Sequence, residues 1–148
     1  MLDEVDRMLL TRLQEDATQS YAALGKAVGL SAGSAHDRVR KLRERGVIRR
    51  TTVDVAPNAV DRGVSAFVMV NANVWMGDPP TREALLAIPS IQEAHIVAGD
   101  ASLLVKIRTG TTEELQATLR QIFAVDGVTG TQTIVVLETC FERPVNVA

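Results

Sequence analysis

The first 46 residues carry apolar side chains at the spacing of α-helices, in three consecutive stretches. The first helix is expected to begin after Asp3, whose side chain can cap it, and to run to about Asp16. Its apolar positions fall on one helical face and are Val5, Leu9, Leu10 and Leu13. A single apolar face predicts a helix that packs against its neighbours on one side only.

The second and third helices follow with almost no residues between them. Ser20 can cap the second helix and Gly29 can end it, because glycine accepts a left-handed backbone at low cost. Ser31 can cap the third helix at once, and Gly46 follows its last turn. The expected inward residues are Leu24, Ala27 and Val28 in the second helix and Ala35, Val39 and Leu42 in the third. Two short helices joined by a tight turn predict a helix-turn-helix, whose second helix enters the major groove of DNA.

From residue 47 the helical period is lost, and residues 47–55 read as a short β-hairpin or extended arm, the position of a wing. Pro57 and Asn58 then break regular structure. We therefore expect a DNA-binding domain over residues 1–55, a linker over 56–63 and a second domain over 64–148.

The second domain carries strand and helix signals in the order β-α-β-β-α-β. Strands are expected over 64–74, 91–97, 103–108 and from about 131 to 141. Two helices are expected, one capped by Thr81 and the other by Thr111. The second of these helices would turn Leu115, Leu119, Ile122 and Phe123 inward. This order predicts an α+β chain, a winged helix-turn-helix followed by a ferredoxin-like sheet with both helices on one face. The other face needs a cover, which a second copy would supply as a homodimer.

The charge is unevenly distributed along the chain. Residues 1–55 hold ten Lys or Arg against eight Asp or Glu, whereas residues 56–148 hold six against ten. Residues 31–50 alone hold seven basic residues against Asp37 and Glu44. Such a run is either a solvated helix face or a phosphate-binding surface, and the helix-turn-helix pattern favours the second.

Composition excludes several other classes. The lone Cys140 can form no internal disulfide and supplies at most one ligand, so no metal site is expected. No apolar run approaches the length of a membrane span, and residues 1–6 are acidic where a signal peptide would be basic, which indicates a cytoplasmic protein without a membrane partner. No nucleophile and base stand at a compatible spacing. We therefore expect that the protein is not an enzyme, and we expect no catalytic residues and no cofactor.

Four segments in order resemble those of the Lrp/AsnC, or feast/famine, regulators. They are LDEVDRMLLTRLQED, LSAGSAHDRVRKL followed by RERGVI, VAGDASLLVKI and VDGVTGTQTIVVL, and the resemblance covers essentially the whole chain. It implies binding to double-stranded DNA, a ligand-binding second domain of the RAM/AsnC type, and effectors that are commonly amino acids. It also implies homodimers, often four of them closed into an octamer. Two alternatives share parts of this plan: a siroheme-decarboxylase-like enzyme, and an architectural DNA-binding protein that needs no effector.

The candidate DNA contacts lie on the third helix or at its start. They are Ser31, Gly33, Ser34, His36, Arg38, Arg40 and Lys41. Arg38 has two interpretations, because it can reach a phosphate or anchor the third helix to Asp16 or Glu15 of the first. Asp37 puts a negative charge on this surface, so either the operator is unusual or Asp37 pairs with Arg38, Arg40 or Lys41.

The candidate effector residues follow the resemblance to the loop between the second and third strands. They are Gly99, Asp100, Ala101 and Ser102, completed by Thr131 and Thr133 from the last strand of a partner protomer. The two threonines can also be ordinary strand residues. Ala101 stands where the family often has an aromatic residue and Ser102 where it often has a second acidic one, so the identity of the effector does not carry over.

Overall fold

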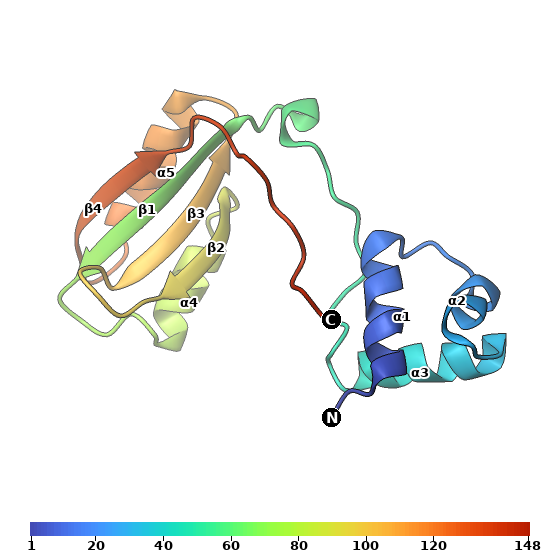
Figure 1. Cartoon of the computed structure of the whole chain (residues 1–148). Helices are drawn as coiled ribbons and strands as arrows, with labels where there is room; N and C mark the ends of the chain where they lie inside the picture. Colours follow the sequence, from blue (N-terminus) through green and yellow to red (C-terminus); the bar gives the residue numbers. More distant parts are fainter. The chain divides into compact units, whose positions relative to one another are not determined.

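The computed structural model describes all residues 1–148 and divides them into two compact units. A helical unit comprises Met1–Asp54 together with Phe141–Ala148, and a sheet unit comprises Val55–Cys140 (Figure 1). The sequence assigned residues 141–148 to the second domain, but two side chains of the first helix hold them on the helical unit. Arg7 donates to the carbonyl of Val147 at 2.9 Å, and Gln14 donates to the carbonyl of Val145 at 3.0 Å. None of the helices has the length and apolar character needed to cross a membrane.

Three helices form the helical unit: α1 (Glu4–Glu15), α2 (Tyr21–Val28) and α3 (Ala32–Glu44). The predicted caps are confirmed, since the side chains of Asp3, Ser20 and Ser31 each accept a hydrogen bond from the backbone N–H three residues on. Gly29 ends α2 with a left-handed φ of 76°. A capping side chain bonds to the backbone of the helix that begins directly after it. The local sequence was therefore enough to predict where the three helices begin.

The core of the helical unit is small and forms where the three helices meet. Leu9, Leu24 and Ala35 are buried at its centre. The predicted inward position of Ala27 is wrong, because Ala27 is exposed and Gly25 is buried in its place. A Cβ on Gly25 would lie 2.5 Å from the carbonyl oxygen of Leu30 and 2.9 Å from that of Ser31. Gly25 therefore lets α2 approach the backbone that leads into α3.

Replacing Gly25 with Ala is expected to lower the free energy of unfolding of the helical unit by about 1 to 3 kcal/mol, because the new methyl group meets backbone. Gly33 is the matched control, since a Cβ there meets nothing within 4 Å. Gly33→Ala should leave stability unchanged or raise it by up to about 1 kcal/mol. Thermal unfolding followed by far-UV circular dichroism compares the two. A Gly25→Ala protein as stable as the parent would contradict the close approach.

The hairpin interpretation of residues 47–55 is wrong, and the extended-arm interpretation remains. Residues 47–56 form no strand, and Val47 and Ile48 instead donate their backbone N–H groups to the carbonyl of Leu42 at the end of α3. The hairpin prediction failed for two physical reasons: residues 49–52 offer no glycine or asparagine for a tight turn, and an isolated two-stranded hairpin is marginally stable. A short 3₁₀-helix, η1 (Pro57–Val60), then leads into the sheet unit.

The sheet unit has the predicted order of elements. They are β1 (Val64–Ala72), α4 (Pro79–Leu86), β2 (Ile91–Ile96), β3 (Leu103–Thr109), α5 (Thr112–Phe123) and β4 (Val128–Val135). All neighbouring strands are antiparallel and the sheet order is β2-β3-β1-β4, so the ferredoxin-like prediction is confirmed (Figure 1). The cap of α4 is Asp78 rather than the predicted Thr81, because the Asp78 carboxylate accepts a hydrogen bond from the Thr81 N–H.

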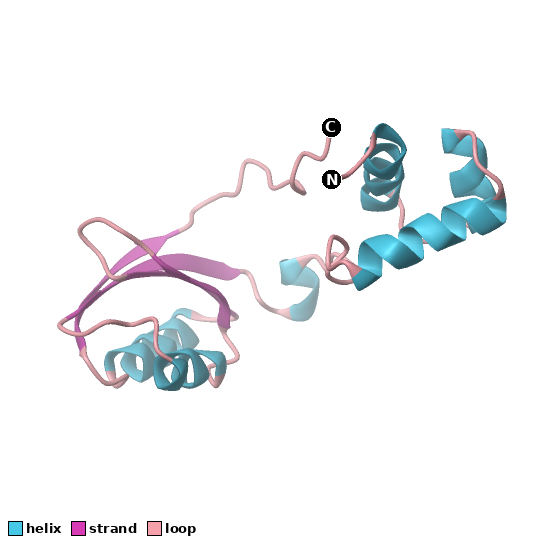
Figure 2. Ribbon diagram, turned by 90° about the horizontal axis from the view of Figure 1, so that it is seen from below, coloured by secondary structure: helices cyan, strands magenta, loops and turns pink.

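Both helices cover the same face of this sheet (Figure 2). The core between them is apolar, with Val68, Val105 and Ile107 fully buried on the central strands and Ile122 fully buried on α5. Phe123 was expected to face inward, but 55% of its surface is exposed at the last residue of α5.

The other face of the sheet, the open face, is not covered by either helix of this unit. Phe67, Met69 and Leu104 are half-buried there, between the fully buried residues of the opposite face. In the strand register Phe67 lies between Lys106 on β3 and Ile134 on β4, and the ammonium of Lys106 lies 5.9 Å from the centre of the Phe67 ring. A row of apolar side chains therefore crosses the open face, with the ammonium of Lys106 beside Phe67.

Candidate functional site

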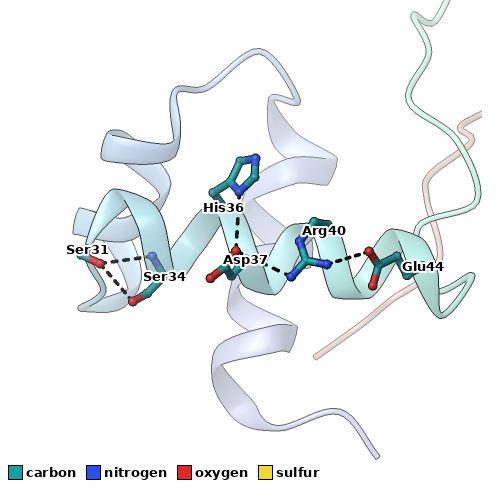
Figure 3. A network of polar contacts seen from close by, with 6 residues as sticks. All are labelled: Ser31, Ser34, His36, Asp37, Arg40 and Glu44. Atoms are coloured by element: carbon teal, nitrogen blue, oxygen red, sulfur yellow. Dashed lines mark hydrogen bonds and ion pairs between the residues drawn. The ribbon is translucent and has the colours of Figure 1, made fainter.

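Helix α3 has a buried side and an exposed polar side. Ala35, Val39 and Leu42 are at most 1% exposed. Successive residues of a helix are about 100° apart, so the side opposite these three residues carries a row of polar side chains. The predicted DNA contacts belong to this row or lie next to it. Figure 3 shows six of these polar residues, namely Ser31, Ser34, His36, Asp37, Arg40 and Glu44. Six of the seven predicted contacts, all except Arg38, thus lie at the start or on the exposed surface of one helix.

Arg40 lies between two carboxylates on this exposed side. Its guanidinium donates to Glu44 at 2.7 Å and lies 3.8 Å from Asp37 (Figure 3). The hydrogen bond to Glu44 and the charge of that carboxylate raise the pKa of Arg40, and the charge of Asp37 raises it further. Of the basic neighbours considered for Asp37, Arg40 is therefore the one that it approaches.

Arg38 is directed away from this surface, toward the start of α1. Its guanidinium donates to Asp3 at 2.6 Å and to Asp6 at 3.1 Å. The hydrogen bond from Arg38 lowers the pKa of the Asp3 carboxyl below its ordinary value, and the backbone hydrogen bond from Asp6 lowers it further. The anchoring interpretation of Arg38 thus fits the structure, although the partners are at the beginning of α1 and not Asp16 or Glu15.

The remaining residues of α3 differ in how firmly they are held. The ring of His36 packs edge to face on Tyr21 of α2, with the centroids 4.7 Å apart, and its Nδ1 lies 3.8 Å from Asp37. Ser34 is bound to Ser31 through both its N–H and its hydroxyl. Lys41 is exposed and takes no part in the ion pairs of α3, so its ammonium is available to an anionic ligand.

The predicted effector loop joins β2 to β3 at one end of the sheet. Gly99 has a φ of 146°, which favours glycine, and no atom lies within 4 Å of the position of a Cβ there. Ser102 is fixed to β1, since its N–H donates to the carbonyl of Val70 at 2.9 Å. Asp100 is exposed.

Thr131 and Thr133 lie on β4, on the far side of β1 from the loop. Thr131 is in register with Val70 and Thr133 with Val68. Within one protomer β1 therefore lies between the two threonines and β3, the strand that follows the loop.

Two pockets of the sheet unit lie elsewhere. One of about 520 Å³ lies between α4 and β2, next to Arg82 and Leu86. The other, of about 540 Å³, lies beside η1 and is lined by Arg62 and Arg108. None of the six predicted effector residues lines either pocket. No group of three or more His, Cys, Asp or Glu side chains is arranged to hold a metal ion.

Comparison with protein families decides what these two units are. The family model of the AsnC-type helix-turn-helix domain matches residues 2–43, and that of the Lrp/AsnC ligand binding domain matches residues 65–145. The chain belongs to the Lrp/AsnC family. It is a transcriptional regulator of the Lrp/AsnC type, with a helix-turn-helix and a ligand-binding domain, as the resemblance of its four segments implied.

Individual Lrp/AsnC relatives match over nearly the whole chain. HTH-type transcriptional regulator FL11 of Pyrococcus abyssi is 36% identical over 93% of this chain and 91% of its own length. The structure of Escherichia coli AsnC has a TM-score of 0.90 at 27% identity and covers 99% of both chains. A feast or famine regulatory protein from M. tuberculosis, complexed with L-methionine, has a TM-score of 0.88 at 27% identity over 96% of both chains. The curated relatives are named as regulators and not as enzymes.

Proposed function

We propose that this Lrp/AsnC protein binds specific operator sequences in double-stranded DNA through α3 and changes that binding in response to an amino acid. The observation that carries the proposal is the placement of α3, which buries one side against α1 and α2 and exposes a polar side with Arg40 and Lys41. This is the arrangement in which a recognition helix enters the major groove. A regulator of this kind acts in the cytoplasm, where the DNA is.

The proposed DNA contacts are six of the seven residues expected from the sequence. Ser31, Gly33, Ser34 and His36 lie in the first half of α3 or just before it, where recognition helices meet base edges. Arg40 and Lys41 follow on the exposed side. Arg38 is left out because its guanidinium is engaged by Asp3 and Asp6.

Replacing Lys41 with Ala is expected to weaken binding to all DNA sequences about equally and to reduce the slope of log K against log salt concentration by about 1, since Lys41 has no carboxylate partner and neutralises a phosphate. Replacing Arg40 with Ala should cost about 1 to 3 kcal/mol if Arg40 reads a base. Fluorescence anisotropy at several salt concentrations measures both effects on a duplex selected from a random pool.

Arg120→Ala is the matched control, because it removes one positive charge from α5 of the sheet unit. It should leave both the affinity and the salt slope unchanged. If the Arg40→Ala/Lys41→Ala double variant binds its operator like the parent, α3 is not the reading helix and the proposal fails.

The proposed effector site is built from two protomers. The loop 99–102 of one protomer would contact the amino acid through the N–H groups of the loop and the side chains of Asp100 and Ser102, and a second protomer would contribute Thr131 and Thr133. The relative bound to L-methionine supports an amino acid as the ligand. The separation of the loop from the threonines within one protomer supports the need for a second copy. Dimers joined through the open face, and an octamer of four such dimers, are the proposed assembly. Thr131 and Thr133 are in register with Val70 and Val68 of the helix-covered face, so the effector site is proposed between dimers and not within the open-face interface.

An effector-independent architectural protein is the alternative that keeps the same α3. It would bind DNA equally with and without amino acids, so the same anisotropy titration, repeated in the presence of each amino acid, separates the two.

A further inference from the structure

The exposed side of α3 has a carboxylate at its centre, in the half of the helix that meets base edges. Asp37 is followed around the helix by Arg40 and Glu44, so this side carries two acidic groups around one guanidinium (Figure 3). Its side chain is 63% exposed, whereas Ala35 and Val39 on the buried side are at most 1% exposed. A helix that packs on its core through Ala35 and Val39 therefore presents Asp37 toward the floor of the groove that it enters.

The two carboxylates are not equivalent. Glu44 accepts a hydrogen bond from Arg40 at 2.7 Å and is the last residue of α3. Asp37 lies 3.8 Å from both Arg40 and His36, which is beyond hydrogen-bond distance, and no group of the chain donates a hydrogen bond to it. Its oxygens remain acceptors without a donor from the protein. Contact with DNA removes water from this surface, so the Asp37 carboxylate then needs a donor from the DNA.

The edges of the bases in the major groove differ in what they offer a carboxylate. Guanine presents two acceptors, thymine an acceptor and a methyl group, and adenine an acceptor beside its donor. Cytosine alone presents an amino donor without an adjacent acceptor on the same base. A carboxylate is therefore repelled by guanine and thymine, partly satisfied by adenine and fully matched by cytosine.

We infer that Asp37 is a specificity-determining residue, which accepts a hydrogen bond from the amino group of a cytosine in each operator half-site. The inference rests on the proposed function, because it requires α3 to enter the major groove. The positive charge of Arg40 offsets part of the negative charge of Asp37, so that this carboxylate is able to approach DNA. The surrounding basic residues of α3 and the segment after it, Lys41, Arg43, Arg45, Arg49 and Arg50, supply the attraction to phosphates.

The test is selection of duplexes from a randomised pool by the parent, by Asp37→Asn and by Glu44→Gln at one salt concentration. The parent should enrich cytosine at one position of each half-site. Asn pairs with the donor and acceptor of adenine, so Asp37→Asn should enrich adenine at that position. Anisotropy on the two duplexes should show a preference of about tenfold for cytosine in the parent and its reversal in Asp37→Asn.

Glu44→Gln is the matched control, since it removes the same charge from the same network. Both variants should bind random-sequence DNA more tightly than the parent, but Glu44→Gln should keep cytosine at the selected position. A merely electrostatic role for Asp37 would leave its variant with the same base preferences as the parent, and that result overturns the inference. If the parent itself enriches no sequence, the proposed function fails, which is a different and recognisable outcome.

Discussion

Replacing Met69 with Asp should reduce this Lrp/AsnC regulator from the proposed oligomer to a monomer of 16.0 kDa. Met69 lies on the open face of the sheet between Leu104 of β3 and Gln132 of β4, so no cation is in register with it. Phe67 is a poorer site for the substitution, because Lys106 beside it would neutralise a new carboxylate. In a two-fold dimer the same face meets itself, so the change buries an unpaired charge from each copy.

Light scattering at micromolar protein concentration measures this effect. The parent should have a mass of at least twice 16.0 kDa. Leu86→Asp is the control, since Leu86 is 82% exposed on α4 and lies away from the open face. It should retain at least the mass of a dimer. A parent that is already monomeric, or a Met69→Asp protein with the mass of the parent, would show that the open face is not the dimer interface.

The parts of the fold that the sequence predicted well are those determined by neighbouring residues. The caps at Asp3, Ser20 and Ser31 depend on a hydrogen bond to a residue three positions away, and the order of strands and helices depends on local periodicity. Gly25 was missed as a contact position, because a glycine inside a helical pattern does not by itself reveal which backbone segment approaches it.

The parts that failed depend on distant partners. Apolar residues continue beyond Val135, which suggested a longer last strand, but Val135 already pairs with Ala66 near the beginning of β1, so little partner strand remains. The role of Arg38 is decided by acidic residues more than 30 positions earlier, which no local pattern reveals. The exposed polar row of α3 was predictable because a helix with one buried side exposes the other. The proposed effector site was inferred from the family resemblance alone. Its residues are proposed to come from two protomers, and the pattern of a single chain does not show how two protomers meet.

The other large expected effect concerns Gly99 and the proposed coupling of the two domains. Two recognition helices of a dimer must match half-sites about one turn of DNA apart, roughly 34 Å, or a multiple of this spacing. A ligand bound between protomers is therefore able to change DNA affinity by a modest change in how the protomers meet. The loop 99–102 is the proposed input because it ends at Ser102, whose N–H is fixed to the central strand β1.

Gly99→Trp is expected to abolish the influence of the effector on DNA binding, while ligand-free DNA affinity stays within about tenfold, or 1.4 kcal/mol, of the parent. A Cβ at position 99 meets no atom within 4 Å, so a larger side chain would project from the loop into the space where the effector is proposed to bind. The effector is first found by thermal-shift measurements with the twenty amino acids, beginning with L-methionine. A ligand at a hundredfold excess over its Kd stabilises the protein by about 2.7 kcal/mol.

Gly99→Ala separates obstruction of the site from backbone strain. The φ of 146° at this position is unfavourable for any side chain, so Ala and Trp share the strain but only Trp adds bulk. Gly99→Ala should therefore still respond to the effector, with at most a shifted midpoint, and Gly99→Trp should not respond at all. Both variants are compared by anisotropy with and without the amino acid, after light scattering has shown that they assemble like the parent. An unchanged midpoint in a folded, oligomeric Gly99→Trp protein would place the effector elsewhere, because no ligand could occupy the loop unaffected by an indole at its centre.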